Sequence, residues 1–261
     1  MVYQLNGEEH PHKDPGSWDS KAFYDQLRNG GIGSTSQISP AVYTDYFEPF
    51  LKEGKDILYI SLSGGLTSTW QSSHLAATDL MEEYPERKIS CVDSLAATGG
   101  QGILVILAAQ NQEKGMSLEE NTAWLEENRL HICHWFTVND LNYLKKGGRV
   151  SAATAFVGTM LSIKPIMHTS DEGKLTVVGK ARGRKSSLNT LIDTVGRLGI
   201  DLQDQTMFIC QADCQAEAEA VAAELKRRYG VKEVYINYIG PVIGSHTGPD
   251  TMGLFFVGTE R

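Results

Sequence analysis

The sequence contains few cysteines. Its 261 residues include four, Cys91, Cys133, Cys210 and Cys214. A disulfide scaffold needs a much higher density of cysteine in a short chain, so we expect four reduced thiols. Cys210 and Cys214 have a C-x-x-x-C spacing, but no second pair of ligands lies beside them. Because a tetrahedral zinc site needs four ligands placed together, the sequence predicts no metal centre.

The sequence also lacks a long apolar run. The longest, GILVILAAQ at residues 102–110, falls short of the roughly 18 residues that a membrane-spanning helix needs. The first residues, MVYQLNGEEHPHKDPGSW, contain neither the basic start nor the apolar centre of a secretory signal. We therefore expect a cytoplasmic protein without a membrane span.

Basic residues are outnumbered by acidic ones. The chain has 24 lysines and arginines against 32 aspartates and glutamates, a formal net charge of -8. This balance disfavours a general electrostatic attraction to nucleic acid or to an anionic membrane surface. With 41% hydrophobic and 21% charged residues, the composition is that of a folded protein with one large or two modest cores. A small ligand or a protein partner is the expected target.

The first part of the chain alternates strand-like and helix-like segments. Each expected strand ends in a glycine-rich or hydroxyl-rich loop, and this order predicts an α/β domain with a parallel sheet over residues 1–160. The expected elements are a helix at 39–53, a strand at 56–62, a helix at 69–83, a strand at 88–93 and a helix from about residue 99. Ligands of such sheets bind at the carboxyl ends of the strands, where helix N-termini also point.

The second part predicts a smaller α+β domain over residues 161–261, with antiparallel pairing. Its expected elements are a small-residue helix at 151–165, a hairpin around 171–173, a helix at 186–199, a strand at 207–213, a helix at 216–230, and strands at 233–241 and 253–258. Gly230 is expected to end the helix that precedes it as a C-cap.

Two hydroxyl-rich stretches stand out, STSQISP at 34–40 and SGGLTSTWQSS at 63–73, each just before an expected helix. Ser39, followed by Pro40, is expected to cap one helix, and Ser68 or Thr69 the next. One helix needs one cap, so the remaining hydroxyls are surplus. Helix N-termini favour anions, and neutral hydroxyl and amide donors can bind a carboxylate without a full salt bridge.

His246 stands among glycines and prolines in GPVIGSHTGPDTMG, residues 240–253, between two expected strands. Two interpretations remain open for it, a buried histidine of the core and a functional group. An imidazole can donate to a carboxylate or pass a proton near neutral pH, which suits an acidic ligand.

Taken in chain order, these residues resemble the DegV family, bacterial proteins that bind a fatty acid and present it to a fatty-acid kinase. The resemblance rests on Thr35-Ser36-Gln37 before a helix, the loop Ser63–Ser72, the pair Asp93-Ser94 after a strand, LxxGGR at Leu144–Arg149, and GPVIGxHxGP at Gly240–Pro249. Each motif is weak alone, and the combination in this order is specific.

The resemblance implies an EDD-type parallel-sheet first domain, a smaller second domain and a long-chain fatty acid buried in a pocket. It implies that Thr35, Thr67 and His246 bind the carboxylate, that Ser36, Ser63 and Ser94 support the site, and that Arg149 contacts an acyl phosphate or the kinase. The fatty acid is the ligand, and no cofactor or catalytic residue is expected. The family usually has a strand and an Asp-Ser-containing loop ahead of the position of Met1. Nothing here matches them, so we expect either a misassigned start or an altered sheet.

Three departures from the family pattern concern the ligand site. Thr67 replaces a more usual serine and keeps the hydroxyl, and Gly64 replaces a common second serine and loses one. Asp250 follows Gly248-Pro249 where a glycine is common. A carboxylate at that place is expected to weaken carboxylate binding or to raise the proton affinity of His246.

The chain has no nucleotide-binding loop of its own. GKARGRKSS at 179–187 misses the G-x-x-x-x-G-K-[ST] spacing, so the sequence favours a binding subunit over an enzyme. Three alternatives stay open. One is a serine hydrolase that uses Ser63 or Ser68 with His246 and an aspartate, although no G-x-S-x-G turn is present. Another is an EDD-type phosphocarrier with a covalent histidine, although His246 lies in the wrong half of the chain for that role. The third is a purely regulatory binder without a metabolic role.

Overall fold

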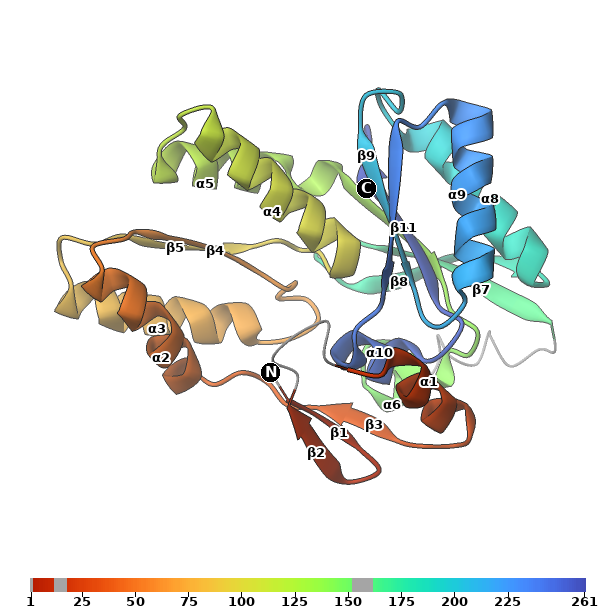
Figure 1. The fold of residues 1–261 in the computed structure, drawn as a ribbon, viewed down its shortest axis with the longest axis horizontal. Coiled ribbons are helices and arrows are strands. Elements are labelled where there is room, and N and C mark those ends of the chain that lie inside the picture. Colours follow the sequence, from red (N-terminus) through yellow and green to blue (C-terminus); the bar gives the residue numbers. More distant parts are fainter. Residues whose placement is uncertain (1, 12–17, 152–161) are drawn as a thin grey trace. The chain divides into compact units, whose positions relative to one another are not determined.

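The computed structural model describes residues 2–11, 18–151 and 162–261. These residues form an α/β fold, as the sequence predicts, and the contacts divide the chain into two compact units (Figure 1). The small unit comprises Gln37–Ile132 and Asp171–Lys174, and the large unit comprises Met1–Ser36, Cys133–Ser170 and Leu175–Arg261. The units are therefore built from interleaved segments and are not consecutive parts of the chain. The boundary expected at residue 160 lies outside the described residues.

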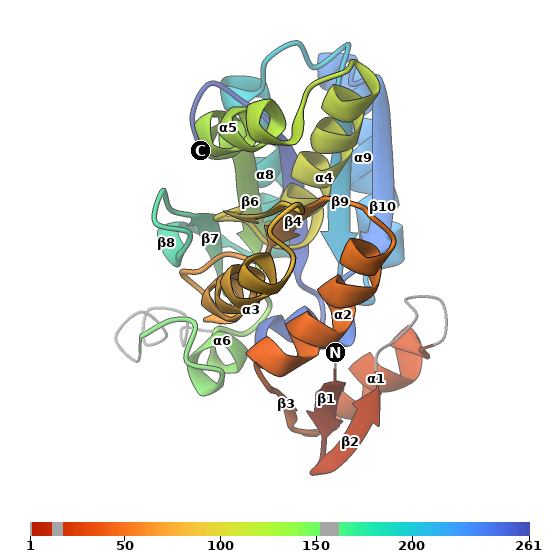
Figure 2. The same cartoon turned by 90° about the vertical axis from the view of Figure 1, so that its left-hand side faces the viewer.

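The small unit is built on two parallel strands, β4 (Ile57–Ser61) and β5 (Ile89–Asp93), paired in register from Ile57 opposite Ile89 to Ser61 opposite Asp93. Helices lie on both sides of this pair (Figures 1 and 2). On one side are α2 (Pro40–Lys52) and α3 (Thr69–Glu83), and on the other are α4 (Thr98–Glu113) and α5 (Leu118–Asn128), followed by the short 3-10 helix η1 (Arg129–His131). The expected helices and strands of this region are all confirmed.

The core of the small unit follows from the spacing of apolar residues. Tyr43, Phe47 and Leu51 recur every fourth residue of α2, so they share one face of the helix and are buried. They pack with Ala76, Ala77 and Leu80 of α3 and with Ile89 of β5. The small residues of α3 let the two helices approach each other, and the pair covers one face of the strands.

The two serines lie at the expected N-cap positions, but among the residues that the structure describes their side chains do not make the expected capping hydrogen bonds. Ser39 is the N-cap of α2 with Pro40 at the first helical position, and Ser68 is the N-cap of α3. Within the described parts of the chain, neither serine makes a side-chain cap hydrogen bond. The side chain of Gln37 contacts the first turn of α3. Its amide donates to the hydroxyl of Ser72 at 2.7 Å and to the carbonyl of Ser68 at 3.3 Å.

The large unit contains a mixed six-stranded sheet in the order β10-β9-β11-β6-β7-β8. Its strands are β6 (Ile132–Thr137), β7 (Ile163–Thr169), β8 (Leu175–Arg182), β9 (Thr206–Gln211), β10 (Glu233–Tyr238) and β11 (Met252–Val257). β9 and β10 are parallel, and β11 with β9, β6 with β7 and β7 with β8 are antiparallel. The predicted hairpin around residues 171–173 is confirmed as the β7–β8 connection.

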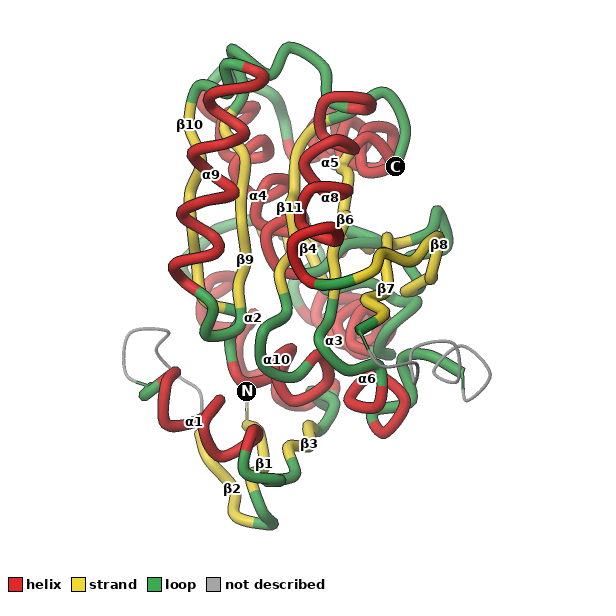
Figure 3. Tube along the Cα trace, turned by 90° about the vertical axis from the view of Figure 1, so that its right-hand side faces the viewer, coloured by secondary structure: helices red, strands yellow, loops and turns green. Residues whose placement is uncertain are grey.

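Two long helices, α8 (Arg184–Leu198) and α9 (Gln215–Tyr229), cover one face of this sheet (Figure 3). Their apolar faces and the sheet enclose the main core, which includes Leu191, Val195, Ile209, Leu225 and Phe256. Both helices were expected from the sequence. The small-residue helix expected at 151–165 falls mostly on residues 152–161, which are not described, and its last residues begin β7.

Two parts of the large unit were not expected. A second sheet joins β1 (Val2–Leu5), β2 (Glu8–Pro11) and β3 (Gly33–Thr35) in the antiparallel order β2-β1-β3, and α1 (Ser20–Arg28) precedes β3. Thr35 therefore ends a strand and does not lie in a loop. The short helices α6 (Asn142–Lys146) and α10 (Pro241–Thr247) are the other addition, and His246 lies on α10.

A substitution of Gly230 tests the predicted end of α9. Gly230 is the C-cap with a left-handed φ of +66°, and its N–H donates to the carbonyl of Lys226. Gly230→Ala should lower the free energy of unfolding by about 1 kcal/mol, because a Cβ is disfavoured in this conformation. Gly102→Ala, in the interior of α4 with open space around it, is the matched control and should be neutral or stabilising. Urea denaturation measures both, and equal effects would contradict the assignment.

Candidate functional site

The structure joins two of the predicted ligand residues directly. The hydroxyl Oγ1 of Thr35 and the ring nitrogen Nε2 of His246 are 2.8 Å apart, a hydrogen bond between the end of β3 and the last turn of α10. These residues are 211 positions apart in the chain and lie in the same unit. The hydrogen bond brings the first hydroxyl-rich stretch and the C-terminal glycine-rich motif together.

Glycines allow this close approach. A Cβ on Gly33 would lie 2.6 Å from the hydroxyl of Ser245, the neighbour of His246, so β3 and α10 meet at backbone distance. A Cβ on Gly147 would lie 2.2 Å from Nδ1 of His246, so the segment after α6 backs directly onto the imidazole. Gly147 of LxxGGR and Gly33, just before the first hydroxyl-rich stretch, thus leave room for the histidine ring and its helix.

The imidazole of His246 is neutral near neutral pH. Burial, and then the positive charge of Arg149, lower the pKa of His246 from 6.5 to about 4. Nδ1 is buried and has no hydrogen-bond partner among the described residues. Of the two effects expected of Asp250, a raised proton affinity of His246 is wrong, because burial and Arg149 lower the pKa of the ring. Asp250 pairs instead with Arg28, whose Nη2 lies 2.8 Å from its carboxylate.

The hydrogen bond favours one proton arrangement. A buried N–H without an acceptor is rarer than a buried lone pair without a donor, so the proton of the neutral ring belongs on Nε2. Nε2 then donates to the Thr35 oxygen, and the hydroxyl proton of Thr35 is left to donate to another acceptor. The pair can therefore offer a ligand oxygen a neutral O–H donor supported by an imidazole.

Arg149 acts on His246 through its positive charge, which helps to lower the pKa of the imidazole. It follows α6, where its N–H donates to the carbonyl of Leu144 at 2.8 Å and its Nη1 donates to the carbonyl of Gly147. The side chain is partly buried, and burial lowers the pKa of the guanidinium. Thr35, His246 and Arg149 are thus the sequence-predicted residues that the large unit brings together.

In the small unit, the hydroxyl of Ser63 is used in hydrogen bonds to the backbone. Its side chain is fully buried, its hydroxyl donates to the carbonyl of Gly173 at 2.8 Å, and its oxygen accepts from the N–H of Gly65 at 3.1 Å. A Cβ on Gly173 would lie 2.0 Å from that oxygen. The serine therefore ties the β4–α3 loop to the tip of the β7–β8 hairpin.

The other predicted hydroxyl residues are Ser94 and Thr67 in the small unit and Ser36 in the large unit. Ser94 is buried and bonds locally to both the N–H and the carbonyl of Ala96, at 3.0 and 3.3 Å. Thr67 is partly buried in the small unit, and its hydroxyl lies 2.8 Å from that of Thr69. Ser36 is exposed at the end of the large unit's first segment.

Sequence reasoning gave Asp93 no role, although it is the main organiser of the small unit's loop. Its carboxylate accepts from the N–H of Gly64 at 3.0 Å and from the N–H of Leu95 at 2.9 Å. A Cβ on Gly64 would lie 2.5 Å from the same carboxylate. The available signal was an aspartate directly after a strand, opposite a Ser-Gly-Gly loop after the neighbouring parallel strand.

Two cavities lie within single units. One of about 360 Å³ in the small unit is lined mainly by apolar residues of β4, α4 and α5, among them Leu58, Ile60, Val105 and Ala108. One of about 450 Å³ in the large unit lies beside Asp213, Cys214 and Asp250. The described residues contain no cluster that could hold a metal ion. Nor does any helix within these ranges have the length and apolarity to cross a membrane.

Comparison with known proteins extends over nearly the whole chain. Residues 4–259 match the family described as "Uncharacterised protein, DegV family". The chain belongs to the DegV family. A DegV domain-containing protein of Clostridium perfringens is 44% identical over 261 residues, which is 100% of this chain and 90% of that protein.

Solved DegV structures share the fold. A DegV family protein from Thermus thermophilus, whose structure is described as fatty acid binding, has a TM-score of 0.81 at 30% identity, over 98% of this chain and 90% of that one. DegV from Bacillus subtilis, described as a fatty acid binding protein, has a TM-score of 0.82 at 26% identity, over 99% of this chain and 90% of that one. The predicted family and α/β class are confirmed.

The depressed pKa of His246 makes the stability of the fold depend on pH. The unfolded chain binds a proton at this histidine near pH 6.5 and the folded chain only near pH 4, so stability falls as the pH falls through this window. The free energy of unfolding of the wild type should therefore decrease more between pH 7 and pH 4 than that of His246→Gln. Chemical denaturation across a pH series measures the difference.

His74→Gln is the matched control, because it removes an exposed histidine of α3. It should leave the pH dependence of the wild type unchanged. If His246→Gln and the wild type lose equal stability on acidification, the imidazole is not buried in its neutral form.

Proposed function

We propose that this DegV protein binds a long-chain fatty acid, holds its carboxylate at the Thr35–His246 pair, and presents it to an ATP-dependent fatty-acid kinase that forms an acyl phosphate. The observation that carries the proposal is the hydrogen bond between Thr35 and the neutral, partly buried imidazole of His246. The related proteins from Thermus thermophilus and Bacillus subtilis, which bind fatty acids by their descriptions, support the ligand class.

The acyl chain supplies most of the affinity in this proposal. A long saturated acid contains about fourteen methylenes, and each is worth roughly 0.8 kcal/mol on burial, so the chain contributes on the order of 10 kcal/mol before the entropic cost of binding. The headgroup then needs to contribute position more than affinity. A hydroxyl donor backed by an imidazole is enough for that purpose.

Neutral donors also suit a carboxylate that has to react. A bidentate arginine would bind it more strongly and would withdraw more of its negative charge. Thr35 donates one hydrogen bond, and His246 stays uncharged down to about pH 4, so the carboxylate oxygen keeps its nucleophilic character. Thr67 is proposed as a second donor on the strength of the family motif, and Ser36 as a supporting residue.

Ser63 and Ser94 support the site indirectly in this proposal. Both hydroxyls are buried and bonded within the small unit, so they shape the loops after β4 and β5. The same contacts weigh against a serine hydrolase, since Ser63 donates its proton to the carbonyl of Gly173 and is not accessible as a nucleophile. The phosphocarrier alternative has no supporting contact, because Nε2 of His246 is engaged with Thr35.

In this proposal the kinase binds the ATP, and this protein binds the fatty acid. No residue of this chain is proposed to act in catalysis, and no cofactor is proposed besides the fatty acid as ligand. Arg149, with its charge near His246, is proposed to contact the acyl phosphate or the kinase. A cytoplasmic site of action stays a prediction of the sequence.

Replacing the hydroxyl donors tests the ligand site. Thr35→Val should weaken binding of palmitic acid roughly tenfold, the value of one hydrogen bond to a charged group, and Thr67→Val should act in the same direction. Binding of methyl palmitate, which has no carboxylate, should change little. Calorimetric or fluorescence titration with both ligands measures this.

Thr176→Val is the control, because Thr176 is an exposed threonine on β8, the edge strand of the six-stranded sheet. Equal palmitic acid affinity in Thr35→Val and Thr176→Val would refute the assignment of Thr35. Wild-type protein that binds neither palmitic acid nor other long-chain acids would refute the function as a whole.

Arg149 is tested separately from ligand binding. With purified bacterial fatty-acid kinase, ATP and palmitate-loaded protein, Arg149→Gln should lower acyl phosphate formation at least tenfold, because a charged contact to the acyl phosphate or to the kinase is lost. Hydroxylamine trapping of the acyl phosphate as a hydroxamate gives the rate. Lys146→Gln removes an exposed cation at the end of α6 and should have little effect. Equal rates in the two variants would remove Arg149 from the proposal.

A further inference from the structure

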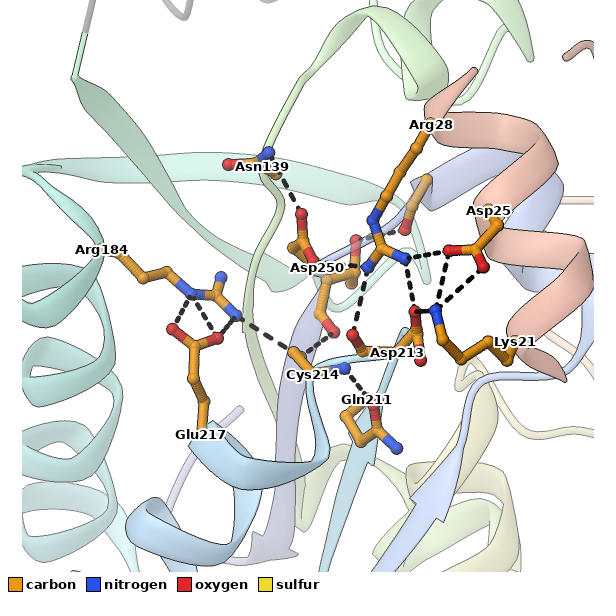
Figure 4. A network of polar contacts seen from close by, with 12 residues as sticks. Lys21, Asp25, Arg28, Asn139, Arg184, Gln211, Asp213, Cys214, Glu217 and Asp250 are labelled. Atoms are coloured by element: carbon orange, nitrogen blue, oxygen red, sulfur yellow. Dashed lines mark hydrogen bonds and ion pairs between the residues drawn. The ribbon is translucent and has the colours of Figure 1, made fainter. Parts of the chain in front are cut away.

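Arg28 makes the densest set of ionic contacts near α10. It is the last residue of α1, and its guanidinium reaches two loops of the large unit (Figure 4). Nη1 pairs with the carboxylate of Asp213, and Nη2 donates to the carbonyl of Asp213 at 3.1 Å and to the carboxylate of Asp250 at 2.8 Å. One side chain thus bridges the loop after β9 and the loop before β11.

Both aspartates occupy an uncommon backbone conformation. The φ angle is +59° at Asp213 and +60° at Asp250, in the left-handed region that few residues other than glycine adopt. The two loops are also joined through the backbone, since the N–H of Asp250 donates to the carbonyl of Ala212 at 2.7 Å and the N–H of Ala212 donates to the carbonyl of Thr251 at 2.9 Å. Arg28 therefore neutralises two carboxylates, those of Asp213 and Asp250, in neighbouring loops.

The loop that contains Asp250 fixes the end of α10. The hydroxyl of Thr251 lies 3.0 Å from the carbonyl of Thr247 and 3.1 Å from that of Gly248, so it closes the helix directly after His246. The other end of α10 is also held by α1. The hydroxyl of Tyr24 donates to the carbonyl of Ile239 at 2.6 Å, and a Cβ on Gly244 would lie 2.6 Å from the same hydroxyl.

We propose that Arg28 is a positioning residue for the carboxylate site. By pairing with Asp213 and Asp250 it fixes the loop after α10, and through that loop it fixes the position of α10 and of His246. The inference rests on the proposed function of the Thr35–His246 pair. The hydrogen bond of that pair joins β3 and α10, so a small displacement of α10 changes its length and direction. Arg28 is the side chain of α1 that ties the loop after α10 to the loop after β9.

Lys21 provides a matched control for Arg28. It is a cation of the same helix and lies 3.9 Å from the carboxylate of Asp213, but no contact joins it to Asp250. Arg28→Gln should weaken palmitic acid binding about tenfold, as the loss of one hydrogen bond to the carboxylate would, while Lys21→Gln changes it less than about twofold. Methyl palmitate binding should be the same in both variants. The ring ¹⁵N signals of His246 in the ligand-free protein should shift in Arg28→Gln alone.

A double-mutant cycle separates positioning from general stability. When Thr35→Val has already removed the hydroxyl donor, adding Arg28→Gln should cause no further loss of palmitic acid affinity. Asp250→Asn, a milder change, should weaken binding less but in the same direction. The inference is overturned if Arg28→Gln and Lys21→Gln behave alike, if Arg28→Gln weakens both ligands equally, or if the losses from Thr35→Val and Arg28→Gln add. A wild-type protein with no palmitic acid affinity would instead overturn the proposed function, and the His246 signals would still report whether Arg28 positions the ring.

Discussion

The hydrogen bond between Thr35 and His246 is the contact on which the proposed chemistry depends. It joins a strand of the N-terminal sheet to a helix near the C-terminus, and both partners are uncharged near neutral pH. Burial keeps the imidazole neutral, and Arg149 adds to that effect. The same burial leaves Nδ1 without a partner, which assigns the proton to Nε2 and leaves the threonine hydroxyl as the donor for a ligand. A charged histidine would bind a carboxylate more tightly and would hold it less ready to react.

The surplus of hydroxyl groups has two structural explanations. Some hydroxyls build loops: Ser63 closes onto the carbonyl of Gly173, and Ser94 folds back on Ala96. Others bond to a single side chain: the hydroxyl of Thr35 to His246 and that of Thr67 to the hydroxyl of Thr69. Asp93 connects the two loops of the small unit by accepting backbone N–H groups from both. A carboxylate in that role uses donors that would otherwise attract an anion, so it limits where a ligand headgroup can bind.

The glycines of the family motifs act through close approach more than through flexibility. Gly147 admits the ring of His246, Gly33 admits Ser245, and Gly244 admits the hydroxyl of Tyr24. Each contact lies against α10 or on it, so the short helix is packed from three directions by residues remote in the chain. Arg28 adds ionic contacts to the loop after β9 and to the loop after α10. The position of a single imidazole thus depends on α1, β3 and the segment after α6 together.

The amino-acid sequence by itself determined the α/β class, most of the helices and strands and the family, because apolar spacing and loop chemistry are local properties of the chain. Its motifs also contain Thr35, His246 and Arg149, which the structure brings together in the large unit. It did not reveal α10, the N-terminal sheet, the role of Asp93 or the partner of Asp250, and it misjudged the effect of Asp250 on His246. Those features depend on which residues meet across more than two hundred positions and on how deeply the imidazole is buried. Only the tertiary structure decides both, since a pKa and a hydrogen-bond partner are properties of a packed environment and not of a residue's neighbours in the chain.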